Sequence, residues 1–232
     1  ARPGIAFAHD TDWQREFESQ EHHLHARNSF ASCTPAVDEQ HVYVAWGTPA
    51  KTSLLALTHD GEPAWETDLA PFVAMHGFGT SPMIYKDLLI VNMLALESPQ
   101  QIAKVQDFKK PGEAYIVAVD KTTGEVHWKT PRASSVAAYS VPCIYQNADG
   151  KDELIGCASG NDVFSLNPEN GKLNWSVESF SMRTVSSPVI AGGLIFGSTG
   201  SGGGGNYVVA IEPSAKPAIK SKVSEQATYV PT

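Results

Sequence analysis

The chain has 232 residues, a hydrophobic fraction of 42% and a formal net charge of −8. Its length and composition suffice to bury a sizeable core, whereas the negative charge argues against nucleic acid or an anionic membrane as the main partner. No run of about 18 apolar residues occurs, so no membrane-spanning helix is predicted.

A first repeated phrase consists of an alternating strand, a turn that contains Gly, and a strand that carries Trp. Full copies occupy residues 53–65, 115–128 and 162–175, and a copy at 207–214 lacks the Gly and the Trp. Each Gly stands where a tight turn can require positive φ. The repeat therefore predicts stacked or circular units.

A second phrase precedes each copy of the first: a short strand that begins at Pro, followed by a continuously apolar strand. Pro is tolerated at the first residue of a strand, and continuously apolar strands are typical of burial on both faces. These prolines are Pro35, Pro82, Pro142 and Pro188, and a further copy begins at Pro231. Units of four short strands at this period indicate a β-propeller.

We therefore predict an all-β fold with about four complete four-stranded blades, at residues 31–70, 79–131, 139–180 and 185–224. Partial blades are expected at 1–30, where Trp13 stands in a Trp strand without its earlier strands, and at 225–232. An open stack of blades leaves exposed edges. We expect the chain to be cut from a longer parent with more blades; closure by a second copy is the alternative.

The segment 118–128, Ala-Val-Asp-Lys-Thr-Thr-Gly-Glu-Val-His-Trp, resembles the tryptophan-docking motif of quinoprotein-type propellers. That family includes the pyrroloquinoline quinone (PQQ) dehydrogenases and the BamB-like proteins of outer-membrane assembly. The resemblance extends from Trp13 to Pro231, and it implies an exported protein from a ring that is often eight-bladed. It also implies docking of each Trp against the next blade and turns shaped by Gly. The residues concerned are Trp65, Trp128 and Trp175, with Gly61, Gly124 and Gly171.

The segments that lead into the four Pro strands hold the candidate binding residues. If the units are equivalent, these segments lie on one rim of the ring beside its axis. Arg27, His76, Tyr139 and Arg183 then converge on the mouth of the channel. Arg and Tyr are enriched at binding hot spots, so we expect a partner to bind there; packing between blades is the alternative explanation for the aromatic residues.

Three other features are weaker candidates. Residues 200–205 satisfy G-x-G-x-x-G, but a strand follows instead of a helix, so we predict a loop. The histidines His22, His23 and His25, near His9 and Glu21, could hold Zn²⁺ or Cu²⁺, but a solvated connector is the favoured interpretation. The insertion at 94–112 is either a binding loop or a surface excursion.

The three cysteines do not form a disulfide framework. Cys143 and Cys157 fall on two strands of the third unit that should pair as a hairpin. A register that pairs Tyr145 with Ile155 places the two cysteines opposite each other, close enough to bridge. Two small buried thiols are the favoured interpretation, since free cysteines are among the most buried residues.

The sequence lacks a vicinal cysteine pair and a C-x-x-C-H haem motif, and its acidic residues fall mostly in turns. These absences argue against a quinone enzyme. The resemblance to BamB-like proteins implies a non-catalytic scaffold, without cofactor or metal, that binds a protein partner in the cell envelope or periplasm, including by strand addition. One alternative is the propeller of a PQQ-dependent alcohol or sugar dehydrogenase that uses PQQ with Ca²⁺. A carbohydrate-binding or sensor module is the other.

Overall fold

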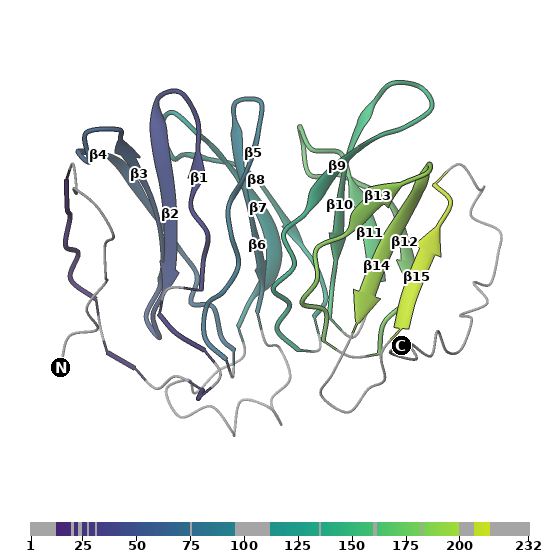
Figure 1. Ribbon diagram of the computed structural model, residues 1–232, viewed down its shortest axis with the longest axis horizontal. Coiled ribbons are helices and arrows are strands. Elements are labelled where there is room, and N and C mark those ends of the chain that lie inside the picture. The colour runs from purple at the N-terminus through teal and green to yellow at the C-terminus, as the bar shows by residue number, and fades with distance from the viewer. Residues whose placement is uncertain are drawn as a thin grey trace, which may run out of the picture.

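The computed structural model describes residues 13–19, 21–22, 25–26, 28–30, 32–74, 76–95, 112–134, 136–159, 162–181, 183–199 and 207–213. These residues form antiparallel sheets that stand in a row in chain order (Figure 1). The predicted all-β propeller fold is confirmed. Over the same ranges no helix has the length and hydropathy needed to cross a membrane.

Each sheet is a meander in which strands adjacent in sequence pair with each other. The first sheet contains β1 (Ala36–Val37), β2 (His41–Gly47), β3 (Thr52–Thr58) and β4 (Pro63–Leu69). The second contains β5 (Met83–Tyr85), β6 (Leu88–Leu94), β7 (Ala114–Asp120) and β8 (Val126–Pro131). The third contains β9 (Cys143–Gln146), β10 (Asp152–Cys157), β11 (Asp162–Leu166) and β12 (Leu173–Glu178). The fourth contains β13 (Val189–Ala191), β14 (Leu194–Thr199) and β15 (Tyr207–Ile211), and the part of the chain predicted to hold its last strand lies outside the described residues.

Apolar cores join each sheet to the next. The three cores contain Tyr43, Leu54 and Leu89 between the first and second sheets, Ile90, Phe164 and Leu166 between the second and third, and Val163, Phe180 and Ile195 between the third and fourth. Strand β6 is buried along its whole length, as expected for a strand that is covered on both faces. Because each large apolar side chain contributes roughly 1.5–3 kcal/mol when buried, neighbouring sheets stabilise each other.

Trp65, on the last strand of the first sheet, contacts the turn of the second sheet. Its indole Nε1 donates a hydrogen bond of 3.0 Å to the carbonyl of Lys121. The ring lies so close to Gly124 that a Cβ at this position would be 2.5 Å from Cε3 of Trp65. The hydroxyl of Thr67 donates a hydrogen bond of 2.6 Å to the carbonyl of Gly124. The ring, the indole N–H and the threonine thus all reach one turn.

The same contact recurs at two other turns. In each case an indole ring lies on a glycine and its N–H donates to a nearby carbonyl. These sets are Trp128 with Gly171 and the carbonyl of Pro168, at 3.0 Å, and Trp13 with Gly61 and the carbonyl of His59, at 2.7 Å. The three glycines have φ between 70° and 78°, the left-handed conformation that the turns were predicted to require.

Trp175 on the third sheet takes a different partner. Its Nε1 donates a hydrogen bond of 2.9 Å to Oε2 of Glu153, on its own sheet. The residue two positions later is Val177, which has no hydroxyl to reach the next sheet, whereas Thr67 and Thr130 do so in the first two sheets. Within the described residues, therefore, the third and fourth sheets lack the indole contact of the other junctions.

Asp38 connects the first and second sheets through charge. Its carboxylate accepts hydrogen bonds from the amides of Gln40 and His41 and from the hydroxyl of Tyr43, and it pairs with Nζ of Lys121 at 3.0 Å. Burial opposes ionisation of Asp38, but these donors outweigh it and hold the pKa of the carboxyl well below its usual range. The charged form of Asp38 is thus favoured in the folded state.

We expect Asp38 to stabilise the fold in a pH-dependent way. Because its pKa is lower in the folded chain than in the unfolded chain, its contribution is complete above about pH 4 and is lost as the pH falls further. Urea unfolding gives the free energy of unfolding of the wild type and of Asp38→Asn at each pH. The difference between the two proteins should be smaller at pH 3 than at pH 7. An equal difference at both pH values would contradict this assignment.

The register between β9 and β10 differs from the prediction. Cys143 pairs with Ile155, and Tyr145 pairs with Glu153, so the predicted pairing of Tyr145 with Ile155 is wrong by two residues. Cys157 does not lie opposite Cys143, and both cysteines are free thiols. Burial raises the pKa of Cys143 to about 11 and that of Cys157 to about 12. Both therefore stay protonated near neutral pH.

Candidate functional site

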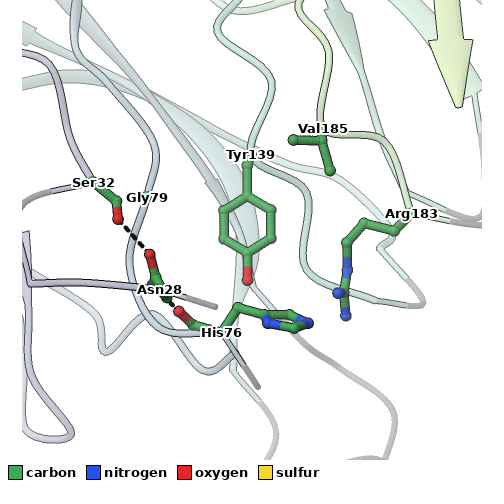
Figure 2. Close-up of a pocket in the computed structure, with 7 residues that line it drawn as sticks. All are labelled: Asn28, Ser32, His76, Gly79, Tyr139, Arg183 and Val185. Carbon is green, nitrogen blue, oxygen red and sulfur yellow. Dashed lines mark hydrogen bonds between the residues drawn. The ribbon is translucent and has the colours of Figure 1, made fainter. Parts of the chain in front are cut away.

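A pocket lies among the segments that precede the four sheets. We call these segments the leading segments. The pocket has a volume of about 320 Å³ (Figure 2). Each sheet contributes at least one lining residue from its leading segment. These are Asn28 and Ser32 from the first sheet, His76 and Gly79 from the second, Tyr139 from the third, and Arg183 and Val185 from the fourth. We call this cavity the rim pocket.

The structure brings three of the four candidate residues to this pocket. His76, Tyr139 and Arg183 all line it, from three different sheets. Arg27 lies outside the described residues, although its neighbour Asn28 lines the pocket.

The position of a residue within the repeat also identifies lining residues, of which only Tyr139 was predicted. Four of them occupy the same place in the repeat, three residues before the Pro of each unit; these are Ser32, Gly79, Tyr139 and Val185. Equivalent positions in equivalent units face the same space, so this offset identifies one ring of lining residues. The Gly at this position in the second unit leaves room for Tyr139, because a Cβ on Gly79 would be 3.3 Å from Cδ1 of that ring.

Tyr139 presents a buried hydroxyl at the pocket. Its ring packs against Phe72, with 5.9 Å between the ring centroids. The hydroxyl oxygen is buried and has no hydrogen-bond partner among the described residues. Burial raises the pKa of Tyr139 to about 12, and the charge of Arg183 and the backbone of His76 beside the hydroxyl oxygen work in the opposite direction. The phenol is therefore neutral near pH 7 and can donate a hydrogen bond to a ligand.

Arg183 is the charged group of the pocket. Its Cζ lies 6.0 Å from the centroid of the Tyr139 ring, and its Nε is buried without a hydrogen-bond partner in the described part of the chain. Thr199 holds the backbone at this position by donating a hydrogen bond of 2.8 Å to the carbonyl of Arg183. None of the described lining residues carries a carboxylate. The guanidinium thus faces the pocket with no acidic side chain among the lining residues to neutralise it.

Side chains from the first sheet close the opposite wall. Asn28 donates through Nδ2 to the carbonyl of His76, and Ser32 donates through its hydroxyl to Oδ1 of Asn28 (Figure 2). The ring of His25 packs edge-on against that of His76, with 4.2 Å between the centroids. These contacts tie the first leading segment to the second and fix the position of His76.

The lining of the rim pocket does not fit PQQ with Ca²⁺. Calcium takes six to eight oxygen ligands, with carboxylates prominent among them. The part of the lining that the structure describes offers an imidazole and a guanidinium but no carboxylate. Across the described ranges, no group of three or more His, Cys, Asp or Glu side chains is arranged to hold a metal. The groups at this site favour binding of an anion or a polar chain over metal-assisted chemistry.

Several predicted features lie wholly or partly outside the described residues. They are His9 and His23 of the histidine cluster, the glycine loop at 200–205, most of the insertion at 94–112, and the partial blade at 225–232.

Comparison with solved structures shows similar folds at low identity. BamB from Moraxella catarrhalis has 17% identity and a TM-score of 0.48, with 82% of this chain and 50% of that chain covered. A europium-containing methanol dehydrogenase has 16% identity and a TM-score of 0.42, with coverages of 62% and 24%. The quinohemoprotein alcohol dehydrogenase from Comamonas testosteroni has 17% identity and a TM-score of 0.45, with coverages of 63% and 28%. The chain thus spans half the length of the BamB structure and about a quarter of each dehydrogenase.

Sequence comparison gives a broader match. No curated protein matches the chain. A family model described as outer membrane protein assembly factor BamB matches residues 9–227, which is nearly the whole chain. The chain therefore belongs to the family of the outer membrane protein assembly factor BamB.

Proposed function

We propose that this chain is a non-catalytic propeller scaffold of the cell envelope that binds a protein partner at the rim pocket. One observation carries the proposal: the leading segments of all four sheets converge on a single pocket that displays Tyr139, Arg183 and His76. Val185 adds an exposed apolar side chain, with 57% of its surface accessible. Tyr and Arg are among the residues that contribute most of the binding energy at protein interfaces.

Family membership supports the scaffold role, since the name of the matching family refers to an assembly factor. The envelope location and the protein partner are inferred for this chain from that membership. The docking role of Trp65 and Trp128 belongs to the same proposal, because rigid contacts between sheets hold the leading segments in place. A rigid scaffold that carries its binding groups on connecting segments is a common arrangement in binding proteins.

A photo-crosslinking amino acid placed at Val185 tests the proposal directly. In envelope preparations it should capture a discrete protein, and the same group at Lys172 serves as the control. Lys172 is exposed and lies in the turn between β11 and β12, at the opposite end of the third sheet from the leading segments. Capture of the same proteins at both positions would contradict a specific site.

Replacement of Arg183 or His76 by Ala should weaken binding of the captured partner by tenfold or more, the order of magnitude of an interface hot spot. Both side chains lie at the pocket and outside the apolar cores, so the unfolding transition should change little. Unchanged binding by both variants would exclude the rim pocket as the binding site.

The dehydrogenase alternative is tested on the same protein. A ligand that binds only the folded state must raise the unfolding temperature. We expect PQQ with Ca²⁺ to leave the unfolding temperature of the chain unchanged; a saturable rise would favour the enzyme over the scaffold.

A further inference from the structure

The junction between the third and fourth sheets, which we call the last seam, is held differently from the others. Its indole, Trp175, hydrogen-bonds within its own sheet, to Glu153. Among the described residues, its apolar core contains fewer buried residues than either of the other two. On the fourth sheet, Val189 and Val208 remain exposed, with 59% and 58% of their surfaces accessible. Within the described ranges, the fourth sheet thus buries few side chains against its neighbour.

Hydrogen bonds across the last seam gather at one end. The amide of Thr184 donates to the hydroxyl of Ser159 at 2.8 Å, the amide of Val141 donates to the hydroxyl of Ser187 at 3.0 Å, and the amide of Tyr139 donates to the carbonyl of Thr184 at 3.3 Å. All three donors lie in leading segments. The described hydrogen bonds between the third and fourth sheets thus lie at the end that carries the rim pocket.

The rim pocket spans the last seam. Tyr139 belongs to the third sheet and Arg183 to the fourth, and the two side chains reach the same cavity (Figure 2). Each has a buried polar atom without a partner among the described residues, the hydroxyl of Tyr139 and Nε of Arg183. Leaving such groups unpaired is costly, and a ligand that accepts from both recovers that cost. A carboxylate matches them, because it accepts from a guanidinium and a hydroxyl together.

We propose that the rim pocket binds a carboxylate group between Tyr139 and Arg183 and that the bound group holds the third and fourth sheets together. The inference deepens the proposed function by naming the chemistry of the bound group and a conformational response. The carboxylate belongs either to a free small acid or to an acidic side chain of the protein partner. In both cases the ligand connects the third sheet to the fourth and opposes their separation.

Hydrogen exchange of the 232-residue chain, with N-acetylglycine as the probe, tests this inference. Exchange through opening of the fourth sheet slows by a factor of one plus the ratio of ligand concentration to Kd, so we expect about a tenfold slowing in β14 and β15 at ten times Kd. Amides of β6 and β7, which are buried within the second sheet, should be unaffected. N-acetylglycinamide, the neutral analogue, should have no effect.

Two variants and a second probe complete the test. Arg183→Gln removes the charge but keeps a polar side chain, and Tyr139→Phe removes only the hydroxyl; both should weaken the protection. A blocked peptide whose only carboxylate is an Asp side chain is the second probe. Tighter binding of this peptide identifies an acidic side chain of the protein partner as the source of the carboxylate, and tighter binding of N-acetylglycine identifies a free small acid. Absence of binding, equal protection by the neutral amide, protection retained in Arg183→Gln, or binding without slower exchange in β14 and β15 would each overturn the inference. Crosslinking at Val185 is independent of these results and judges the partner-binding proposal separately.

Discussion

Gly124→Ala should lower the free energy of unfolding by about 2–5 kcal/mol, the larger of two effects expected at turns of this chain. Gly124 has φ of 76°, where an L side chain costs roughly 1–2 kcal/mol. The new Cβ would also be 2.5 Å from Cε3 of Trp65 and 2.7 Å from Oγ1 of Thr67, and such overpacking costs typically 1–3 kcal/mol. Both costs fall on the contact that joins the first sheet to the second.

Gly150→Ala provides the matched control. Gly150 has φ of 75°, nearly the same backbone conformation, but nothing lies within 4 Å of a Cβ at this position. Only the backbone cost of roughly 1–2 kcal/mol should remain. Urea unfolding of the two variants separates the backbone cost of positive φ from the cost of crowding Trp65 and Thr67. If both lose the same stability, the indole contact at Gly124 does not contribute to the fold.

The repeats in the sequence were sufficient to predict the fold because their residue types indicate both the order of the strands and the turns that need Gly. Continuous apolar runs such as 88–91 became fully buried strands. The Gly of each full repeat adopts positive φ, as the turn requires. These properties are local, so they can be recognised without knowledge of how the sheets pack.

Contacts that depend on a neighbouring sheet were harder to predict. Trp175 occupies the same place in the repeat as Trp65, yet it donates to Glu153, which also accepts from Ser165 and Asn147. The fourth repeat lacks the glycine turn on which an indole could lie. The partner of Trp175 is therefore set by a substitution in the next unit and by a carboxylate in its own.

The register of the third sheet shows a second limit. The loop between β9 and β10 is fixed by hydrogen bonds of Asn147, whose amide donates to the carbonyl of Lys151 and whose carbonyl accepts from the amide of Gly150. This turn pairs Gln146 with Asp152 and so sets Cys143 opposite Ile155. Apolar patterning is the same in registers that differ by two residues, because alternate side chains share a face. The turn geometry, and not the pattern, decides between them.

Asp162→Asn should lower the free energy of unfolding by about 3–5 kcal/mol, because it removes one partner of a buried ion pair. Arg132 follows the last strand of the second sheet, and its Nη2 pairs with Oδ2 of Asp162 at the start of β11 in the third. Their side chains are 12% and 9% exposed. The guanidinium also lies 4.4 Å from the centroid of the Phe164 ring. Without the carboxylate, this charge would stay buried with no counterion.

Two further variants show whether charge is the cause. Glu113→Gln removes one partner of an exposed pair with Lys129, whose side chains are 66% and 43% exposed, and should cost less than about 1 kcal/mol. The double variant Arg132→Met with Asp162→Leu should be more stable than Asp162→Asn alone, because apolar residues can replace a buried pair at little or no cost. Thermal and urea unfolding would measure all three. If the double variant is less stable than Asp162→Asn, the pair stabilises the junction between the second and third sheets through geometry that apolar packing cannot replace. The charge explanation would then be wrong.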